Sequence, residues 1–192
     1  MNFNFIKAII VRCIEIIIRP KEEWKKIKEE NTPVLLLMRD FVFPLIILAV
    51  LTSMIGEYLR IAGTAFDQQL ILLRGLRELA ILTVSISLSI ILVNEMLKTY
   101  HGSRNLDLAA NLVGYSFVPL LIVSVLLGLS AWLYIVGLFA LYLFYILFQG
   151  TPVLLKIAVE KQSNFSALAS MVILMVYLMS SFVLSEIFKS FY

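Results

Sequence analysis

Five long runs of apolar residues constrain this chain more than any other feature of its sequence. We predict five membrane-spanning helices, because each run is close to the roughly 20 residues that cross about 30 Å of hydrocarbon. A hydrophobic content of 61 % with only 15 % charge supports this, since a soluble globule could not bury so much apolar surface. The first predicted span runs to about residue 59 with its core at 41–55, and the others cover about 78–97, 108–127, 131–148 and 167–188.

The predicted fold is therefore an all-α integral membrane protein, a bundle of five transmembrane helices with an N-terminal in-plane amphipathic helix. Residues 1–32 are expected to form N-terminal cytosolic or interfacial helices, and residues 33–192 the membrane domain. Within 3–18 the polar residues fall on one helical face, which indicates a helix lying in the membrane surface. A cleaved signal peptide is the alternative, but Arg12 and Glu15 interrupt the apolar stretch and no small-x-small cleavage site follows.

A second, charged helix is predicted to begin at Pro20, because proline suits the first helical turn. Trp24 and Ile27 lie three residues apart and can face the bilayer, although Trp24 could also be a simple interface anchor on a solvated helix. Four lysines of this segment are predicted to contact anionic headgroups at the membrane surface: Lys21, Lys25, Lys26 and Lys28.

Several turn signals divide the predicted spans. Thr32 followed by Pro33 predicts a helix start, and the same pair at Thr151 and Pro152 predicts another. The short segment 128–130 makes the third and fourth spans an antiparallel hairpin. Segment 56–77 is amphipathic and is expected to rest on the opposite membrane surface. Prolines are expected to kink two spans, and small residues at four-residue spacing to allow close helix packing: Pro44, Pro119; Ser85, Ser89, Ala110, Gly114, Ser181 and Ser185.

The distribution of basic residues predicts the orientation. Twelve of the sixteen Lys and Arg residues fall on one side of the predicted topology, which contains the N-terminus. Because basic residues beside a span resist translocation, we predict a multi-pass protein, of the cytoplasmic membrane if the source is prokaryotic, with a cytosolic N-terminus and an external C-terminus.

The residues available for catalysis are few. With one cysteine, Cys13, and one histidine, His101, there is no Cys/His set for a zinc site, and neither a nucleophile elbow nor a phosphate loop occurs. The carboxylates near span ends form no paired acid/base motif. We therefore predict no enzymatic activity, no cofactor, no metal and no nucleic-acid partner.

Polar residues are nevertheless predicted to gather at the cytosolic ends of the spans. Polar groups near hydrocarbon are costly unless they pair or meet water, so this cluster either joins helices or forms a ligand, proton or partner site. Contacts from Arg39 to Glu95 and from Asp40 to Asn111 would satisfy these groups. The candidate cluster comprises Arg39, Asp40, Asn94, Glu95, Asn111 and Gln149.

Two motifs give the chain a resemblance to a known family. Gly114, Tyr115 and Pro119 form a Gly-Tyr-x-x-x-Pro segment that opens the third span, and Pro20 and Trp24 form a Pro-x-x-x-Trp entry. Together they resemble the Yip (Ypt/Rab-interacting protein) membrane family, in its prokaryotic form, over about residues 19–188. The Asp-Leu-x-Gly-Pro segment and the long N-terminal region of the eukaryotic members are missing, so the resemblance does not imply direct GTPase binding.

The resemblance implies a non-enzymatic membrane protein that organises or shapes membrane or scaffolds other membrane proteins. Its expected partners are the lipid bilayer, with anionic headgroups, and a membrane protein or a second copy of the chain. A small transporter or permease subunit that uses the polar cluster is the alternative, since the first and third spans share Pro-Leu runs at Pro44 and Pro119. A membrane enzyme would need a pocket with perturbed carboxylates.

Overall fold

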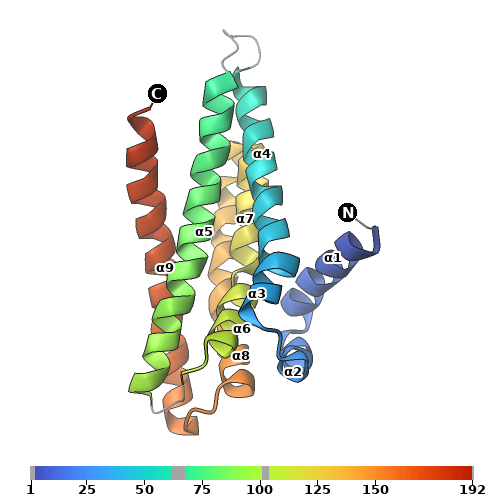
Figure 1. Cartoon of the computed structure of the whole chain (residues 1–192), viewed down its shortest axis with the longest axis vertical. Helices are drawn as coiled ribbons and strands as arrows, with labels where there is room; N and C mark the ends of the chain where they lie inside the picture. The colour runs from blue at the N-terminus through green and yellow to red at the C-terminus, as the bar shows by residue number, and fades with distance from the viewer. Residues whose placement is uncertain (1–2, 62–67, 101–103, 192) are drawn as a thin grey trace.

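The computed structural model describes residues 3–61, 68–100 and 104–191, and the elements in these ranges are all helices (Figure 1). In chain order they are α1 (Phe3–Ile18), α2 (Pro20–Glu30), α3 (Val34–Leu37), the π-helical η1 (Met38–Val42), α4 (Phe43–Ile61), α5 (Gln68–Thr99), α6 (Leu106–Ser116), α7 (Val118–Leu129), the 3-10 helix η2 (Ala131–Leu141), α8 (Tyr142–Leu154) and α9 (Val159–Lys189).

Within these ranges, four helices are long and apolar enough to cross a membrane, and the bent pair α6–α7 makes a fifth when it is counted as one span. The four are Val34–Ile61, Gln68–Thr99, Tyr134–Leu154 and Val159–Lys189. The predicted all-α membrane bundle is confirmed. Figure 1 places α2 and the C-terminus at opposite ends of the bundle, as an odd number of crossings requires, while the cytosolic side stays a prediction.

The prediction that segment 56–77 lies on the membrane surface is wrong for its described part. α4 continues through Gly56 to Ile61, and α5 begins at Gln68, ten residues before the predicted start of the second span. The two helices pack on each other along their length and rise together at the end of the bundle far from α2. The described polar residues of this segment therefore lie in extensions of the first and second span helices, α4 and α5. We call this end the far end.

The third span is broken at the proline that the sequence singles out. α6 and α7 meet at an angle of 43° around Phe117, and Pro119 lies in the first turn of α7. Proline has no N–H to donate and its ring crowds the preceding turn, so the predicted kink at Pro119 has the expected cause. Ahead of Pro44 the first span instead contains a π-helical turn, in which the Phe43 N–H bonds to the Met38 carbonyl.

The two Thr-Pro pairs do not start helices in the predicted way. At the first pair, Pro33 occupies the N-cap position of α3, one residue later than predicted, and no side chain of the pair accepts a capping hydrogen bond. Thr151 and Pro152 lie inside the last turn of α8, where the Thr151 hydroxyl bonds to the Leu147 carbonyl at 3.0 Å. The break follows at Leu155. The expected hairpin between the third and fourth spans is confirmed, because only Ser130 separates α7 from η2 and these two helices pack together.

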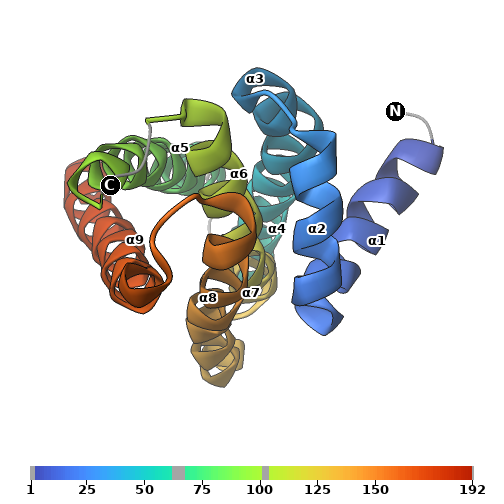
Figure 2. The same cartoon turned by 90° about the horizontal axis from the view of Figure 1, so that it is seen from below.

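The packing places the N-terminal helices against one side of the bundle. α5 contacts α4, α6 and α9, while α4 also packs on α7, and α8 joins α6 to α9. Seen from the α2 end, α1 and α2 lie side by side, on the side of the bundle away from α9 (Figure 2). α2 contacts α8, so we treat α1 and α2 as one N-terminal unit docked on the bundle.

Candidate functional site

Trp24 fixes the N-terminal unit to the bundle. Its side chain is fully buried, and its Nε1 donates a hydrogen bond of 3.0 Å to the carbonyl of Ile146 in α8. α2 turns Pro20, Glu23, Trp24 and Ile27 inward because these positions fall on one face of a helix. The expectation that Trp24 faces the bilayer or the interface is wrong, because the ring lies inside the protein.

Gly150 makes the room for the indole ring. A Cβ at this position would lie 2.5 Å from Cε2 of Trp24, closer than any van der Waals contact allows. On its other side the ring meets Tyr115 of α6 edge-on, with centroids 6.1 Å apart, and Tyr115 in turn packs on Phe41 at 4.7 Å. Trp24, Tyr115 and Gly150 form what we call the tryptophan dock.

A buried carboxylate accompanies the dock. Glu23 is only 3 % exposed, and its oxygens pair with Arg12 of α1 and with Lys26 at 2.8 Å. Arg12 also pairs with Glu30, and its guanidinium lies 5.8 Å from the centroid of the Tyr115 ring. Two cations thus compensate one buried anion, which is what allows Glu23 to lie inside. These contacts tie α1 to both ends of α2.

The exposed faces of the N-terminal unit differ in character. On α1, four isoleucines at four-residue spacing are exposed although they are apolar, and we call them the isoleucine row: Ile6, Ile10, Ile14 and Ile18. On α2, the exposed lysines without an ion pair to a described residue form the lysine face: Lys21, Lys25 and Lys28. Lys26 is different, because its hydrogen bond to Glu23 raises the pKa of the ammonium and holds it at the dock.

Cys13 is a buried position of α1. This side chain is 7 % exposed within the apolar core, and burial raises the pKa of the thiol to about 11. A cavity of about 300 Å³ lies beside it, between α1 and the first span, lined by Ile9, Arg12, Phe41 and Tyr115 among others.

A second contact orders the entry to the first span. Asp107 of α6 accepts a 2.8 Å hydrogen bond from the backbone N–H of Val34, and Asn111 donates to the carbonyls of Thr32 and Asp107, both at 2.7 Å. The N-terminus of α3 is therefore capped by a side chain from another helix.

Substituting Asp107 with alanine is expected to cost about 1 kcal/mol of unfolding free energy, as loss of an N-cap does. Thermal unfolding in detergent would measure this. Asp107→Asn keeps an accepting oxygen and should retain most of the stability, so equal losses in both variants would contradict a capping role.

The predicted polar cluster does not form the expected contacts. Arg39 pairs with its neighbour Asp40 at 2.6 Å, and Glu95 pairs with Arg104. Asn111 bonds to backbone carbonyls, so both cross-helix contacts proposed from the sequence, Arg39 to Glu95 and Asp40 to Asn111, are replaced by others. The Oδ1 of Asn94 is buried without a hydrogen-bond partner among the described residues. Gln149 on α8 is half-buried, and His101 lies outside the described residues.

A comparison with known protein families shows the family to which the chain belongs. The family model called Yip1 domain matches residues 14–182, which includes part of α1, the whole of α2 and the span helices up to most of α9. This chain belongs to the Yip1 domain family. Neither a curated protein nor a solved structure matched the chain.

The tryptophan dock lies wholly inside the matched Yip1 domain. Two motif residues named from the sequence, Trp24 and Tyr115, come from motifs about ninety positions apart and meet at this dock. Pro20 begins α2, and a Cβ on Gly114 would meet Leu37 at 3.1 Å, so the motif positions shape helix entry and close packing. In the part of this Yip1 domain that the structure describes, no three His, Cys, Asp or Glu side chains could share a metal ion.

Three features of the candidate site were not predicted from the sequence: the Arg12–Glu23 pair beside the dock, the role of Gly150 in the dock, and the cap from Asp107 on α3. The pair joins residues of two helices across the turn before Pro20. A buried partner for Glu23 can be inferred only once Trp24 is known to face inward, since both residues then lie on the inner face of α2. Gly150 stands in an apolar run, which carries no signal of an indole ring beside it.

Proposed function

We propose that this Yip1-domain protein is non-enzymatic and organises or shapes membrane, with the N-terminal unit contacting the anionic leaflet. The observation that carries the proposal is the tryptophan dock, because it fixes an amphipathic helix rigidly to a membrane-spanning bundle. A membrane-surface helix on a flexible tether could move away from the lipid when the bilayer resists. A docked helix cannot.

The two exposed faces suit the two layers of a membrane interface. The isoleucine row can enter the boundary between headgroups and acyl chains, and the lysine face can meet anionic headgroups. Figure 1 shows α1 running obliquely away from the bundle. If α1 is held at this position and inserts into one leaflet, it adds area to that leaflet only. Unequal leaflet areas favour curvature of the membrane.

The bundle offers a surface for a partner or a second copy. α9 packs on α5 and α8 and leaves an apolar row exposed, with Met171, Met175 and Phe182 each more than half exposed. Methionine side chains adapt to differently shaped neighbours. The scaffold role in our proposal uses this face.

We prefer organisation to transport because of how the bundle interior is filled. Leu82, Ile86 and Ile90 of α5 are buried in one continuous apolar core with Val113 and Leu121. A transporter needs a hydrated path near the midplane. The polar cluster, which the transport hypothesis would use, forms local contacts instead.

Reversing the charge of the lysine face is expected to remove the preference for anionic lipid. Each basic residue near an anionic surface contributes about 1 kcal/mol at low screening. The full chain would be placed in membranes of phosphatidylcholine and phosphatidylglycerol, extracted with a disc-forming polymer, and the ratio of the two lipids measured. We expect enrichment of phosphatidylglycerol with the native chain and a ratio close to bulk with Lys21→Glu, Lys25→Glu and Lys28→Glu combined.

The matched control replaces the same three lysines with arginine, which keeps the charge and should keep the enrichment. Lys26 is left unchanged because its replacement would also disturb Glu23. High salt should weaken the enrichment, since exposed charges are screened. Equal enrichment by the native chain and the glutamate variant would show that these lysines do not select lipid.

A further inference from the structure

The far end of the bundle contains a cleft that the proposed function does not use. Two adjoining cavities of about 530 Å³ and 170 Å³ share Arg74, Leu127 and Gly128 in their walls. The larger also includes Glu57 and Arg60, and the smaller includes Arg77 and Glu78. We call the two together the arginine cleft.

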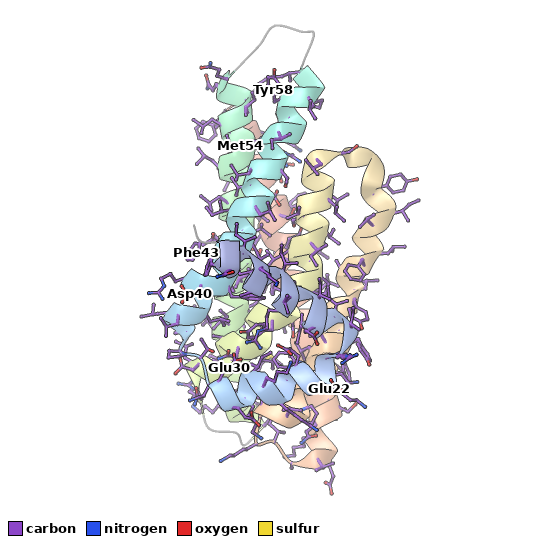
Figure 3. All side chains as sticks on the ribbon, turned by 90° about the vertical axis from the view of Figure 1, so that its right-hand side faces the viewer. Glu22, Glu30, Asp40, Phe43, Met54 and Tyr58 are labelled. Atoms are coloured by element: carbon purple, nitrogen blue, oxygen red, sulfur yellow. The ribbon has the colours of Figure 1, made fainter. Side chains whose placement is uncertain are left out.

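The cleft exists because one hairpin is shorter than its neighbours. Figure 3 shows α4, with Met54 and Tyr58 labelled, rising beyond the turn that joins α7 to η2. The turn meets α4 at Gly56, whose Cβ position would lie 1.9 Å from the carbonyl oxygen of Gly128. Beyond this contact α4 and α5 continue past the end of the hairpin. Arg60 of α4 and Arg74 and Arg77 of α5 line the cavities there.

The charges in the cleft do not balance. Arg60 pairs with Glu57, and Arg74 lies close enough to interact with both Glu57 and Glu78. Arg77 forms no hydrogen bond or ion pair with a described residue, and its Nε is buried without a hydrogen-bond partner. Among the described lining residues, three arginines face two glutamates. The cleft therefore carries one positive charge in excess.

The depth of Arg77 makes this excess costly. α5 has 32 residues, which is about 48 Å of helix against about 30 Å of hydrocarbon. If the surplus is shared between both ends, about 9 Å of α5 stands outside at each end. Arg74 then lies at the hydrocarbon boundary and Arg77 about 4 to 5 Å below it, at 1.5 Å per residue. A guanidinium at this depth is costly unless it pairs with an anion or reaches water, and an anion in the cleft would meet this need.

We propose that the arginine cleft binds a singly charged phosphodiester, with Arg77 as its principal contact. A guanidinium binds phosphate oxygens with two parallel hydrogen bonds, which an ammonium cannot do. The hydroxyls of Ser124, Tyr177 and Ser181 line the same cavity and can donate to further oxygens. One negative charge matches the excess of one, whereas Glu57 and Glu78 would repel a more highly charged anion. The cavity of about 170 Å³ is several times the roughly 30 Å³ of one water molecule.

The geometry admits two sources of this chemistry, a phospholipid headgroup of the far leaflet or a soluble phosphodiester. The proposal is independent of the lysine face, which lies at the other end of the bundle.

The test measures thermal unfolding of the full chain in detergent with three additives: short-chain phosphatidylglycerol, the matching diacylglycerol, and dimethyl phosphate, which is a soluble phosphodiester with one negative charge. A ligand that binds only the folded state raises the unfolding temperature with its concentration. We expect a rise with phosphatidylglycerol and none with diacylglycerol. In Arg77→Gln the apparent affinity for phosphatidylglycerol should fall by about tenfold or more, because a bidentate contact is lost. A comparable rise with dimethyl phosphate would identify the soluble source.

Two further variants keep the test decisive. Arg77→Lys retains the charge and should fold, yet its affinity should fall severalfold because the two-point contact is lost. The variant with the lysine face changed to glutamate should keep the full shift, which separates this site from the proposed function. The proposal is overturned if no phosphate-bearing additive stabilises the native chain, or if both Arg77 variants respond as the native chain does.

Discussion

Replacing Trp24 with alanine is expected to release the N-terminal unit from the bundle. The change removes a fully buried indole and its hydrogen bond to Ile146, and it leaves a cavity between α2, α6 and α8. Truncation of a buried tryptophan costs about 3–5 kcal/mol. The cost falls on the contact between α2 and α8, which is the main attachment of this unit. We therefore expect α1 and α2 to detach while the spans remain folded.

Detachment of the N-terminal unit can be measured through the single cysteine of the chain, Cys13. Cys13 is buried and its thiol has a pKa of about 11, so very little reactive thiolate exists at pH 8. Exposure would return the pKa toward its ordinary value of 9.0, and two pH units correspond to about 100-fold more thiolate. Alkylation by a water-soluble maleimide should therefore accelerate by about that factor or more in Trp24→Ala.

The controls separate detachment from general damage. Lys25→Ala changes an exposed neighbour on the same helix and should leave the alkylation rate unchanged. Gly150→Ala attacks the dock from the bundle side, because the added Cβ would meet the indole ring at 2.5 Å, and it should accelerate alkylation as well. Retention of helical circular dichroism would show that the spans are intact. If Cys13 in Trp24→Ala reacts as slowly as in the native chain, Trp24 does not hold the unit.

The fold could be predicted from the sequence because hydrocarbon length imposes a strong and simple rule. Apolar runs of about 20 residues located the spans, and Pro119 located the break in the third one. The ends of the spans could not be located in this way. Segment 56–77 is amphipathic and reads as a surface helix, yet its described residues belong to α4 and α5, which project past the neighbouring hairpin.

The contacts of the dock were harder to predict than the spans because they depend on which face each helix turns inward. The lysines and glutamates of α2 suggest a solvated helix, and only the structure shows Glu23 buried between two cations. Trp24 and Tyr115 were both singled out through family motifs, but no pattern in the sequence places them in contact. A motif can thus identify the partners of a dock without revealing that they meet.

The spacing of small residues predicted only part of the close helix packing. Ser85, Ser89, Ala110 and Gly114 stand at the four-residue spacing typical of close packing, and all four are buried. Among the glycines that the structure describes, the tightest contact for an added Cβ is elsewhere, between Gly56 of α4 and the Gly128 carbonyl of α7. Thr52 stands four residues before Gly56, and Ser124 four residues before Gly128. The same spacing thus occurs in both runs, but spacing within one helix does not reveal which two helices meet.

Substituting Gly56 with alanine is expected to force α4 and α7 apart. The new Cβ would lie 1.9 Å from the Gly128 carbonyl oxygen and 3.1 Å from that of Leu129. Both obstacles are backbone atoms, which cannot rotate away as a side chain can. Overpacking usually costs about 1–3 kcal/mol, and we expect Gly56→Ala at the upper end of this range. In a bilayer the loss is not recovered by burial elsewhere, because helix association there depends on close packing.

Two other glycines provide a graded control within the same chain. A Cβ on Gly75 would meet Cγ and Sδ of Met54 at 2.7 and 2.8 Å, and this flexible side chain can move aside, so Gly75→Ala should cost less. A Cβ on Gly137 would meet nothing within 4 Å, so Gly137→Ala should be neutral or slightly stabilising. Unfolding free energies from detergent titration should follow this order, because the order depends only on what each new methyl group meets. Equal losses of unfolding free energy in Gly56→Ala and Gly137→Ala would mean that α4 and α7 do not cross at Gly56 and Gly128.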